Sequence, residues 1–367
     1  MKNSIGTSLI LTLFGESHGP MIGALLDGLP PGIKVDESFI AAQLTKRRPQ
    51  GKTDTARVEE DKFTIASGVF NGYTTGAPLC ILIPNENVRS SDYEKTAGLA
   101  RPSHADYAAH IRYHGFEDYR GGGHFSGRVT AGIVAAGAIA LQILESKGIK
   151  IATHILQCGH VRDRDFSNFS TELDIVNSRD FPVIADVEQA MTDVILEARS
   201  KNDSVGGIVQ TAVTGLMCGI GEPWFDSLEG VLSKAMFAIG GVKGIEFGKG
   251  FGFGAAYGSQ VNDQLHSENG IIKTLSNNNG GINGGLSNGM PILFNLAVKP
   301  TPSISQSQRT VNLTTGENEI LELKGRHDPA IIRRICIVVS SLTAIVMCDM
   351  LALRYGTDRL MPDRELK

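Results

Sequence analysis

The sequence predicts an α+β fold, a β-α-β sandwich in which antiparallel sheets enclose a central layer of helices. Helical and strand patterns do not alternate regularly along the chain, which argues against a doubly wound parallel sheet. Residues 330–354 are apolar on most helical faces, which suits a helix buried within the protein. No long low-complexity linker divides the chain, so residues 1–367 are expected to form a single domain.

Helices are predicted where apolar residues recur at helical spacing. The first, residues 38–48, opens after Asp36 and carries Ile40 and Leu44. The second, residues 128–147, is rich in alanine, isoleucine and leucine and stops at Gly148. Two further helices are amphipathic and one is apolar throughout; they are expected at residues 187–201, 228–239 and 330–354.

Strands are predicted where short apolar runs are bounded by glycine, proline or polar residues. These runs cover residues 9–14, 21–26, 63–68, 78–83, 149–159, 207–216 and 290–298. Glycine is dense in two other stretches, residues 240–258 and 277–285. Both are expected to be loops whose backbone N–H groups can reach a ligand.

Composition and charge exclude several function classes. The formal net charge of −4 gives no bulk attraction for nucleic acid, and the arginines gather beside glycine and histidine, which favours a small polyanionic ligand. The five cysteines are scattered without a Cys-x-x-Cys pair, so we expect buried thiols and no metal site. The apolar runs at residues 8–14 and 335–347 are shorter than the ~20 residues that span a bilayer. We therefore expect a cytoplasmic protein without membrane contact.

Two short motifs present histidines that can face a substrate. Residues 15–19, Gly-Glu-Ser-His-Gly, follow an apolar run and carry His18. Residues 101–107, Arg-Pro-Ser-His-Ala-Asp-Tyr, carry His104. A single histidine of either kind is more often a structural residue, but small flanking residues and nearby arginines favour proton transfer. An anion bound at these arginines would keep a histidine protonated as a general acid.

A third motif, residues 119–128, runs through three glycines into a predicted helix. Free N–H groups and the helix dipole make such an approach a plausible anion site. The alternative is a flexible turn with Ser126 as the helix N-cap. Arg128 favours the anion site, because a cation in the first turn opposes the dipole. We expect Arg128→Ala to lose substrate binding while stability changes by only ~0.5 kcal/mol.

A fourth motif, residues 325–329, reads Gly-Arg-His-Asp-Pro and precedes the apolar helix. Asp328 is expected to cap that helix, with Pro329 at its first position. A capping aspartate beside an arginine and a histidine can also take part in proton transfer.

In this order, the motifs resemble the chorismate synthase family over nearly the whole chain. Further matching segments are residues 27–32, 46–51, 67–70, 74–78, 241–246, 279–285 and 299–303. The resemblance implies a lyase (EC 4.2.3.5) that converts 5-enolpyruvylshikimate-3-phosphate to chorismate and phosphate by a 1,4-anti elimination. This is the last common step of the shikimate pathway toward the aromatic amino acids. It also implies a need for reduced FMN without net redox change, a sandwich of antiparallel sheets around helices, and a homotetramer.

The resemblance also implies roles for individual residues. His18 would protonate the departing phosphate, His104 would manage the protonation state of the reduced flavin, and Asp328 would assist deprotonation at flavin N5. Substrate or NADP would contact Ser17, Arg47, Arg48, Arg101 and Arg128. FMN would contact His124, Phe125, Ser126, Gly240, Gly241, Gly284, Lys299, Pro300, Thr301, Pro302, Ser303 and Arg326.

One segment departs from the family pattern. Many members carry Arg-Ser-Ser-Ala-Arg where this chain has His-Phe-Ser-Gly-Arg at residues 124–128, so the effect of His124 and Phe125 on flavin binding stays open. The source of reducing equivalents also stays open. Some members reduce their own flavin with NADPH, but no extra insertion is evident here, which favours an external flavin reductase.

Two other functions compete with this interpretation. The first is a flavin oxidoreductase that passes hydride from NADPH to a substrate; phosphate release without net NADPH consumption would argue against it. The second is a non-catalytic polyanion-binding protein, which would have no need of His18, His104 and Asp328.

Overall fold

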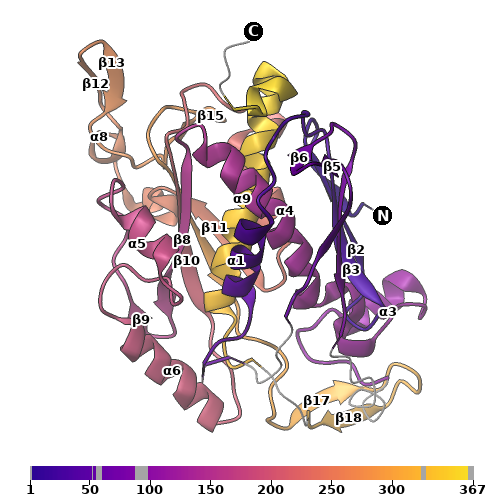
Figure 1. Cartoon of the computed structure of the whole chain (residues 1–367). Coiled ribbons are helices and arrows are strands. Elements are labelled where there is room, and N and C mark those ends of the chain that lie inside the picture. Colours follow the sequence, from indigo (N-terminus) through magenta and orange to yellow (C-terminus); the bar gives the residue numbers. More distant parts are fainter. Residues whose placement is uncertain (1, 52, 55–59, 87–97, 324–327, 363–367) are drawn as a thin grey trace.

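The computed structural model describes residues 2–51, 53–54, 60–86, 98–323 and 328–362. Two five-stranded antiparallel sheets stand on either side of a layer of helices (Figure 1). The predicted α+β sandwich is therefore present. Arg326 and the Gly-Arg-His start of the fourth motif lie outside the described residues.

The first sheet is built from the N-terminal quarter of the chain. Its strand order is β1(Ser4–Ile5), β2(Ile10–Gly15), β3(Met21–Asp27), β7(Leu79–Pro84) and β4(Thr64–Ser67). β2 and β3 form a hairpin with Ile10 opposite Asp27 and Gly15 opposite Ile22. Leu11, Ile22 and Ile81 are almost fully buried against the helices. The hairpin turn at residues 16–20 therefore lies at one end of this sheet.

The second sheet contains β11(Val242–Phe247), β16(Ile292–Val298), β10(Gly207–Thr214), β8(Lys150–Cys158) and β9(Val161–Arg162), in that order. The predicted strands at residues 149–159, 207–216 and 290–298 correspond to β8, β10 and β16. The loop expected over residues 240–258 is wrong in part, because β11 forms the edge of the sheet there. Gly244 is accommodated in this strand opposite Ala297, so the glycine content of the segment did not prevent pairing.

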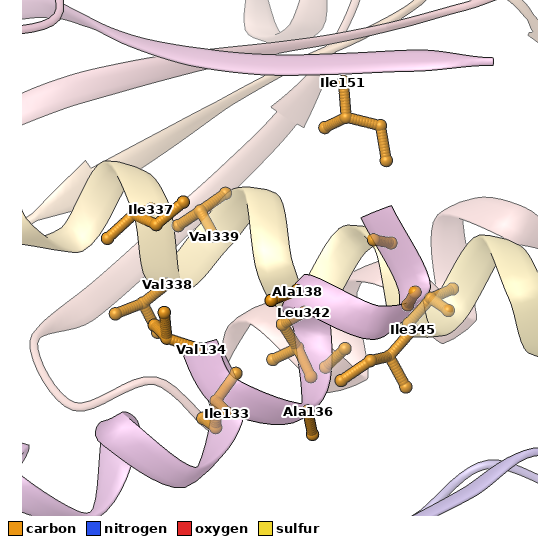
Figure 2. Packing of buried hydrophobic residues seen from close by; sticks show 14 of the residues in the cluster. Ile133, Val134, Ala136, Ala138, Ile151, Ile337, Val338, Val339, Leu342 and Ile345 are labelled. Atoms are coloured by element: carbon orange, nitrogen blue, oxygen red, sulfur yellow. The ribbon is translucent and has the colours of Figure 1, made fainter. Parts of the chain in front are cut away.

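The helical layer consists mainly of α1(Glu37–Arg47), α4(Thr130–Glu145), α7(Leu228–Met236) and α9(Ile332–Tyr355). Figure 2 shows Val134 and Ala138 of α4 beside Val338 and Leu342 of α9. A Cβ atom on Gly137 would lie 2.3 Å from the Cβ of Ser341, so the absence of a side chain lets the two helices approach closely. This contact forms the centre of the core.

A buried carboxylate ties the central helix to the first sheet. Asp349 of α9 is 2% exposed and accepts hydrogen bonds from the backbone N–H groups of Thr7, Ser8 and Leu9. These donors satisfy a charge that would otherwise be costly inside an apolar helix. These hydrogen bonds explain how an otherwise apolar helix accommodates the buried carboxylate of Asp349.

The N-terminus of α9 differs from the prediction. The helix begins at Ile332, and its N-cap, Ile331, makes no side-chain capping bond. Asp328 is therefore not the cap; its carboxylate forms an ion pair with Arg334. The Asp328 carboxylate thus contacts the first turn of α9 through the Arg334 side chain.

Smaller elements surround the sandwich. They are α3(Asp106–Tyr113), α5(Glu172–Ser178), α6(Glu188–Ser200), α8(Gly258–Val261) and the hairpins β5(Val69–Phe70)–β6(Tyr73–Thr74), β12(Leu265–Glu268)–β13(Ile271–Thr274), β14(Ile282–Asn283)–β15(Leu286–Ser287) and β17(Gln308–Val311)–β18(Asn318–Leu321). Two helical segments, Gly127–Glu145 and Ile332–Tyr355, are long and apolar enough to cross a membrane. Most of each lies buried inside the protein, as core helices do.

Candidate active site

The turn between β2 and β3 carries the first candidate catalytic residue, His18. Gly15 ends β2 with φ of +93°, and a Cβ atom there would lie 2.3 Å from the carbonyl oxygen of Met21, so only glycine fits. Ser17 is fully buried and His18 is 7% exposed. Ser17 Oγ has no hydrogen-bond partner among the described residues. A buried hydroxyl of this kind is costly unless a ligand satisfies it.

The glycine turn, defined here as Gly121, Gly122 and Gly123, brings the two histidines together. All three glycines have positive φ, within the 3₁₀ segment Arg120–Phe125. A Cβ atom on Gly121 would lie 2.7 Å from His18 Nε2, and one on Gly122 would lie 3.4 Å from His104 Nε2. The backbone of consecutive residues therefore contacts both rings. Only glycine lets the backbone come this close to the rings. The sequence marked the three glycines as a possible anion site but did not predict their contact with the two histidines.

His104 belongs to a hydrogen-bonded cluster with Arg101 and Asp106. Its Nδ1 lies 2.6 Å from Asp106 Oδ1. Arg101 donates from Nε to Oδ2 at 2.8 Å and from Nη2 to Oδ1 at 2.7 Å. Burial favours the neutral acid, but hydrogen bonds from His104 and Arg101 outweigh it and hold the pKa of Asp106 well below its ordinary value. Arg101, predicted to bind substrate, thus has an internal anionic partner.

A second cluster is centred on Asp61, whose side chain is fully buried. Arg47, at the end of α1, donates from Nη2 to Asp61 Oδ2 at 2.7 Å, and Arg128 forms an ion pair with Oδ1 of the same carboxylate. Burial opposes ionisation, yet the charges of Arg47 and Arg128 lower the pKa of Asp61. Arg47 and Arg128 therefore share one buried carboxylate.

Arg128 was predicted to need a ligand anion at its helix start. Instead Asp61 compensates its charge, and Arg128 Nε and Nη2 donate to Asn85 Oδ1 at 3.0 Å and to the Pro84 carbonyl at 3.1 Å. Only 7% of the residue is exposed. The premise that Arg128 is an exposed surface residue is therefore wrong.

Arg48, the neighbouring candidate, occupies a different environment. It lines an open surface cleft together with Glu60, Asp61, Lys62 and Phe63. Its backbone is extended and ends α1, whereas Arg47 is still within the helix. The structure therefore distinguishes two arginines that the sequence left as alternatives, one buried at Asp61 and one at the cleft.

Asn85, which follows β7, connects the His18 turn to this cluster and was not predicted. Its Nδ2 donates to the carbonyl oxygens of Glu16 and Gly19, both at 2.9 Å, while Oδ1 accepts from Arg128. The neutral amide suits this position because it supplies donors and an acceptor together. No pattern in the sequence separates Asn85 from other loop asparagines.

The sequence model of the family described as chorismate synthase matches residues 9–352. The chain belongs to the chorismate synthase family. The chorismate synthase of Dehalococcoides mccartyi is 46% identical over 362 residues, which cover 97% of this chain and 98% of the relative. That of Pyrococcus abyssi is 44% identical over 351 residues, covering 95% of this chain and 97% of the relative.

A crystal structure of chorismate synthase has a similar fold, with a TM-score of 0.76 and 27% sequence identity. The match covers 96% of this chain and 94% of the other. The predicted family and fold class are thus confirmed. Membership in the chorismate synthase family makes the chain a lyase of the shikimate pathway, in agreement with the motifs in its sequence.

The segment that the family resemblance assigns to flavin lies beside the His104 cluster. Lys299 Nζ donates to the Ser103 carbonyl at 2.5 Å, and Lys299 N donates to the Gly241 carbonyl at 2.9 Å. Partial burial and the charge of Lys243 lower the pKa of Lys299. Thr301 Oγ1 is buried without a hydrogen-bond partner in the described part of the chain. A cation and an unsatisfied hydroxyl fit a phosphate-bearing cofactor.

Residues 124–126, which depart from the chorismate synthase family pattern at His124 and Phe125 and keep it at Ser126, make contacts within the protein. His124 Nδ1 lies 3.0 Å from the Gly15 carbonyl oxygen, which ties the segment to the His18 turn. Phe125 is 44% exposed and packs edge-on against Tyr113. Ser126 Oγ accepts from Arg128 N, so Ser126 is the N-cap that the sequence offered as an alternative. His124 thus contributes to the turn without the cationic fork of an arginine.

Three other candidates lie apart from this group of contacts. Gly284 is in the β14–β15 hairpin, which pairs with Gly221, and no contact among the described residues joins it to the glycine turn. Gly240 precedes β11 and has open space around its α-carbon. Asp328 is engaged with Arg334 near the start of α9. The structure therefore unites His18, His104, Arg101 and Arg128, with Lys299 bound to the same loop as His104.

Proposed function

We propose that the protein converts 5-enolpyruvylshikimate-3-phosphate to chorismate and phosphate by a 1,4-anti elimination that depends on reduced FMN. The observation that carries this proposal is the contact of His18 and His104 with consecutive glycines of one turn, in a chain of this family. When bound, reduced FMN supplies electron density as phosphate departs and takes it back as the C6 hydrogen leaves.

His18 is proposed to protonate the departing phosphate. Its ring edge bearing Nε2 lies against Gly121 beside the unsatisfied Ser17 hydroxyl, so a phosphate oxygen bound here would meet a ring nitrogen and a hydroxyl together. A positioned acid of this kind contributes roughly 10²–10⁴-fold to rate. Ser17 is proposed to hold the same phosphate group.

His104 is proposed to manage the protonation state of the flavin. Lys299 binds the carbonyl of the preceding residue, Ser103, and so connects His104 to residues 299–303. With Gly241, His124, Phe125 and Ser126, these residues are proposed to surround FMN. The family resemblance also assigns Gly240 and Gly284 to FMN and Asp328 to deprotonation at flavin N5, so we keep these roles as proposals for residues that lie apart from the other contacts.

The arginines are proposed to bind the phosphate and the two carboxylates of the substrate. Arg47 and Arg128 place two guanidinium groups together at Asp61, which favours an incoming anion. Arg101 and Arg48 would provide further donors, the first beside His104 and the second at the cleft. The bidentate contact between Arg101 and Asp106 is strong. A substrate anion would therefore bind Arg101 while Asp106 stays bound to it.

The wider setting follows the family. We propose a cytoplasmic homotetramer that receives its reduced flavin from an external reductase, with NADPH as the original source of electrons. This arrangement needs neither nucleic acid nor membrane, in keeping with the net charge of −4.

An anaerobic assay with pre-reduced FMN tests the proposal by following chorismate absorbance and phosphate release together. Equal amounts of both products, without net flavin oxidation, are expected. His18→Ala and His104→Ala should each lower turnover by roughly 10²–10⁴-fold while FMN and substrate still bind. Phosphate release that consumes a stoichiometric reductant would instead indicate a flavin oxidoreductase. Wild-type rates in both variants would remove the two histidines from the mechanism.

A further inference from the structure

We propose that Asp106 is a positioning residue for His104, whose imidazole it holds with the proton on Nδ1 and with Nε2 turned to the glycine turn. This inference rests on the proposed function only for the role of His104 in the reaction. Asp106 stands two residues after His104 in the second motif, but no sequence pattern separates it from a solvated acidic residue.

The hydrogen-bond geometry determines which nitrogen of His104 carries a proton. Asp106 Oδ1 lies 2.6 Å from His104 Nδ1 and 2.7 Å from Arg101 Nη2. An ionised carboxylate only accepts and a guanidinium only donates, so a bond at 2.6 Å requires a hydrogen on Nδ1. Arg101 Nη2 and His104 Nδ1 both donate to Asp106 Oδ1, and this shared acceptor brings the two nitrogens to 3.1 Å from each other.

The carboxylate is itself fixed from three sides. Arg101 binds both its oxygens, and the backbone N–H of Arg101 donates to Oδ2 at 2.9 Å. Asp106 is also the first residue of α3, where the helix dipole favours negative charge. Rotation of Asp106 away from His104 would break the bidentate arginine contact. The acceptor facing Nδ1 is therefore held in place before any ligand binds.

The opposite edge of the imidazole faces the place where reactants are proposed to bind. A Cβ atom on Gly122 would lie 3.2 Å from His104 Cε1 and 3.4 Å from Nε2. The side chain of His104 is 17% exposed, so the ring is only partly covered by the protein. With Nδ1 occupied by Asp106, proton exchange with a ligand is restricted to Nε2. Asp106 thus acts on the reaction through the ring of His104.

Asp106→Asn in the full-length chain tests this role. The asparagine offers one acceptor and one NH₂ group, so satisfying Arg101 turns the amide donor toward Nδ1 and favours the Nε2–H tautomer. Nitrogen chemical shifts of ¹⁵N-histidine-labelled protein should show His104 changing tautomer. Turnover with pre-reduced FMN should fall about 10²-fold, the lower range for a positioned acid or base, while KM changes by less than about 3-fold.

Asp118→Asn is the matched control, because Asp118 accepts a similar two-pronged contact from Arg120 at 2.8 and 2.9 Å. The Asp118→Asn substitution should leave the nitrogen chemical shifts of His104 unchanged. In the His104→Ala background, Asp106→Asn should cause no further loss of turnover, since its effect passes through the missing ring. Unchanged His104 shifts in Asp106→Asn, or an equal loss of turnover with and without His104, would overturn the proposal. The nitrogen chemical shifts of His104 test the role of Asp106 even if the protein catalyses another reaction.

Discussion

Two clusters in this protein are built alike around one aspartate but differ in how deeply they are buried. In each, one aspartate accepts from two cationic or ring nitrogen donors: Asp61 from Arg47 and Arg128, and Asp106 from Arg101 and His104. The side chains around Asp61 are 0–8% exposed, whereas those around Asp106 are 15–20% exposed. The difference in burial indicates that the Asp61 cluster contributes more to holding segments of the fold together, whereas the Asp106 cluster is more open to a ligand.

The comparison changes how motif arginines are interpreted. Arg101 and Arg128 both looked like anion-binding residues in the sequence, and each already contacts an internal carboxylate. At Asp61 the pairing joins the end of α1 to the start of the α4 segment, so its loss affects folding. At Asp106 the pairing orients a histidine, so its loss affects chemistry.

Asp61→Asn should cause the largest loss of stability. It removes the charged partner that buried Arg47 and Arg128 share, and breaking a buried pair in this way costs about 3–5 kcal/mol. Urea unfolding of the variant should show this decrease in the free energy of unfolding. Glu60→Gln is the control, because its partner Lys62 and Glu60 itself are 67% and 62% exposed, and its effect should be near zero.

The same comparison predicts a pH dependence. The pKa of Asp61 is lowered in the folded protein, so its ionised form stabilises the fold fully above the ordinary aspartate pKa of about 3.9. This contribution is lost as the pH falls from there through the lower folded-state pKa. The difference in unfolding free energy between wild type and Asp61→Asn should therefore narrow in acid. A difference that stays constant from neutral pH to pH 3 would contradict the assignment.

Arg128→Ala should have a smaller effect on stability, because Asp61 keeps Arg47 as its partner. We expect a loss of about 2 kcal/mol, which corresponds to unsatisfied groups at Asp61, Asn85 and Pro84. This exceeds the ~0.5 kcal/mol that an exposed residue would give. Thermal or urea unfolding decides between the two values, and substrate titration should show that binding is lost as well. Arg120→Ala, at a more exposed arginine, serves as the comparison.

The sequence predicted the parts of this site that depend on local pattern. Apolar runs located β2 and β3, and therefore the turn that carries His18. Residue types also marked His104 and Arg101 within a short motif. Asp61 and Asn85 could not be found this way, because their partners are distant in the chain and each looks like an ordinary loop residue. Glycine content misled the prediction at β11, where pairing with β16 outweighs the intrinsic preference of the residue.

Among these variants, a substitution in the glycine turn should have the smallest effect on stability. It also separates an effect on folding most clearly from an effect on catalysis. Gly122 has φ of +82°, and Gly115 has φ of +78° at the end of α3. A Cβ atom at either position would lie 3.2 Å from the Cε1 atom of a histidine, His104 for Gly122 and His110 for Gly115. Alanine at either position should therefore cost about 1–2 kcal/mol of stability for the left-handed backbone.

The two glycine variants should nevertheless differ in activity. Asp106 holds the other edge of the His104 ring, so the ring cannot move away from a new methyl group without weakening that hydrogen bond. Small displacements of a catalytic group can cost up to about 10²-fold in rate, so Gly122→Ala should lower turnover by about 10-fold or more. Gly115→Ala should keep wild-type turnover, because His110 contacts Glu117 outside the proposed site. Equal turnover in both variants would mean that the position of His104 against the glycine turn does not matter for the reaction.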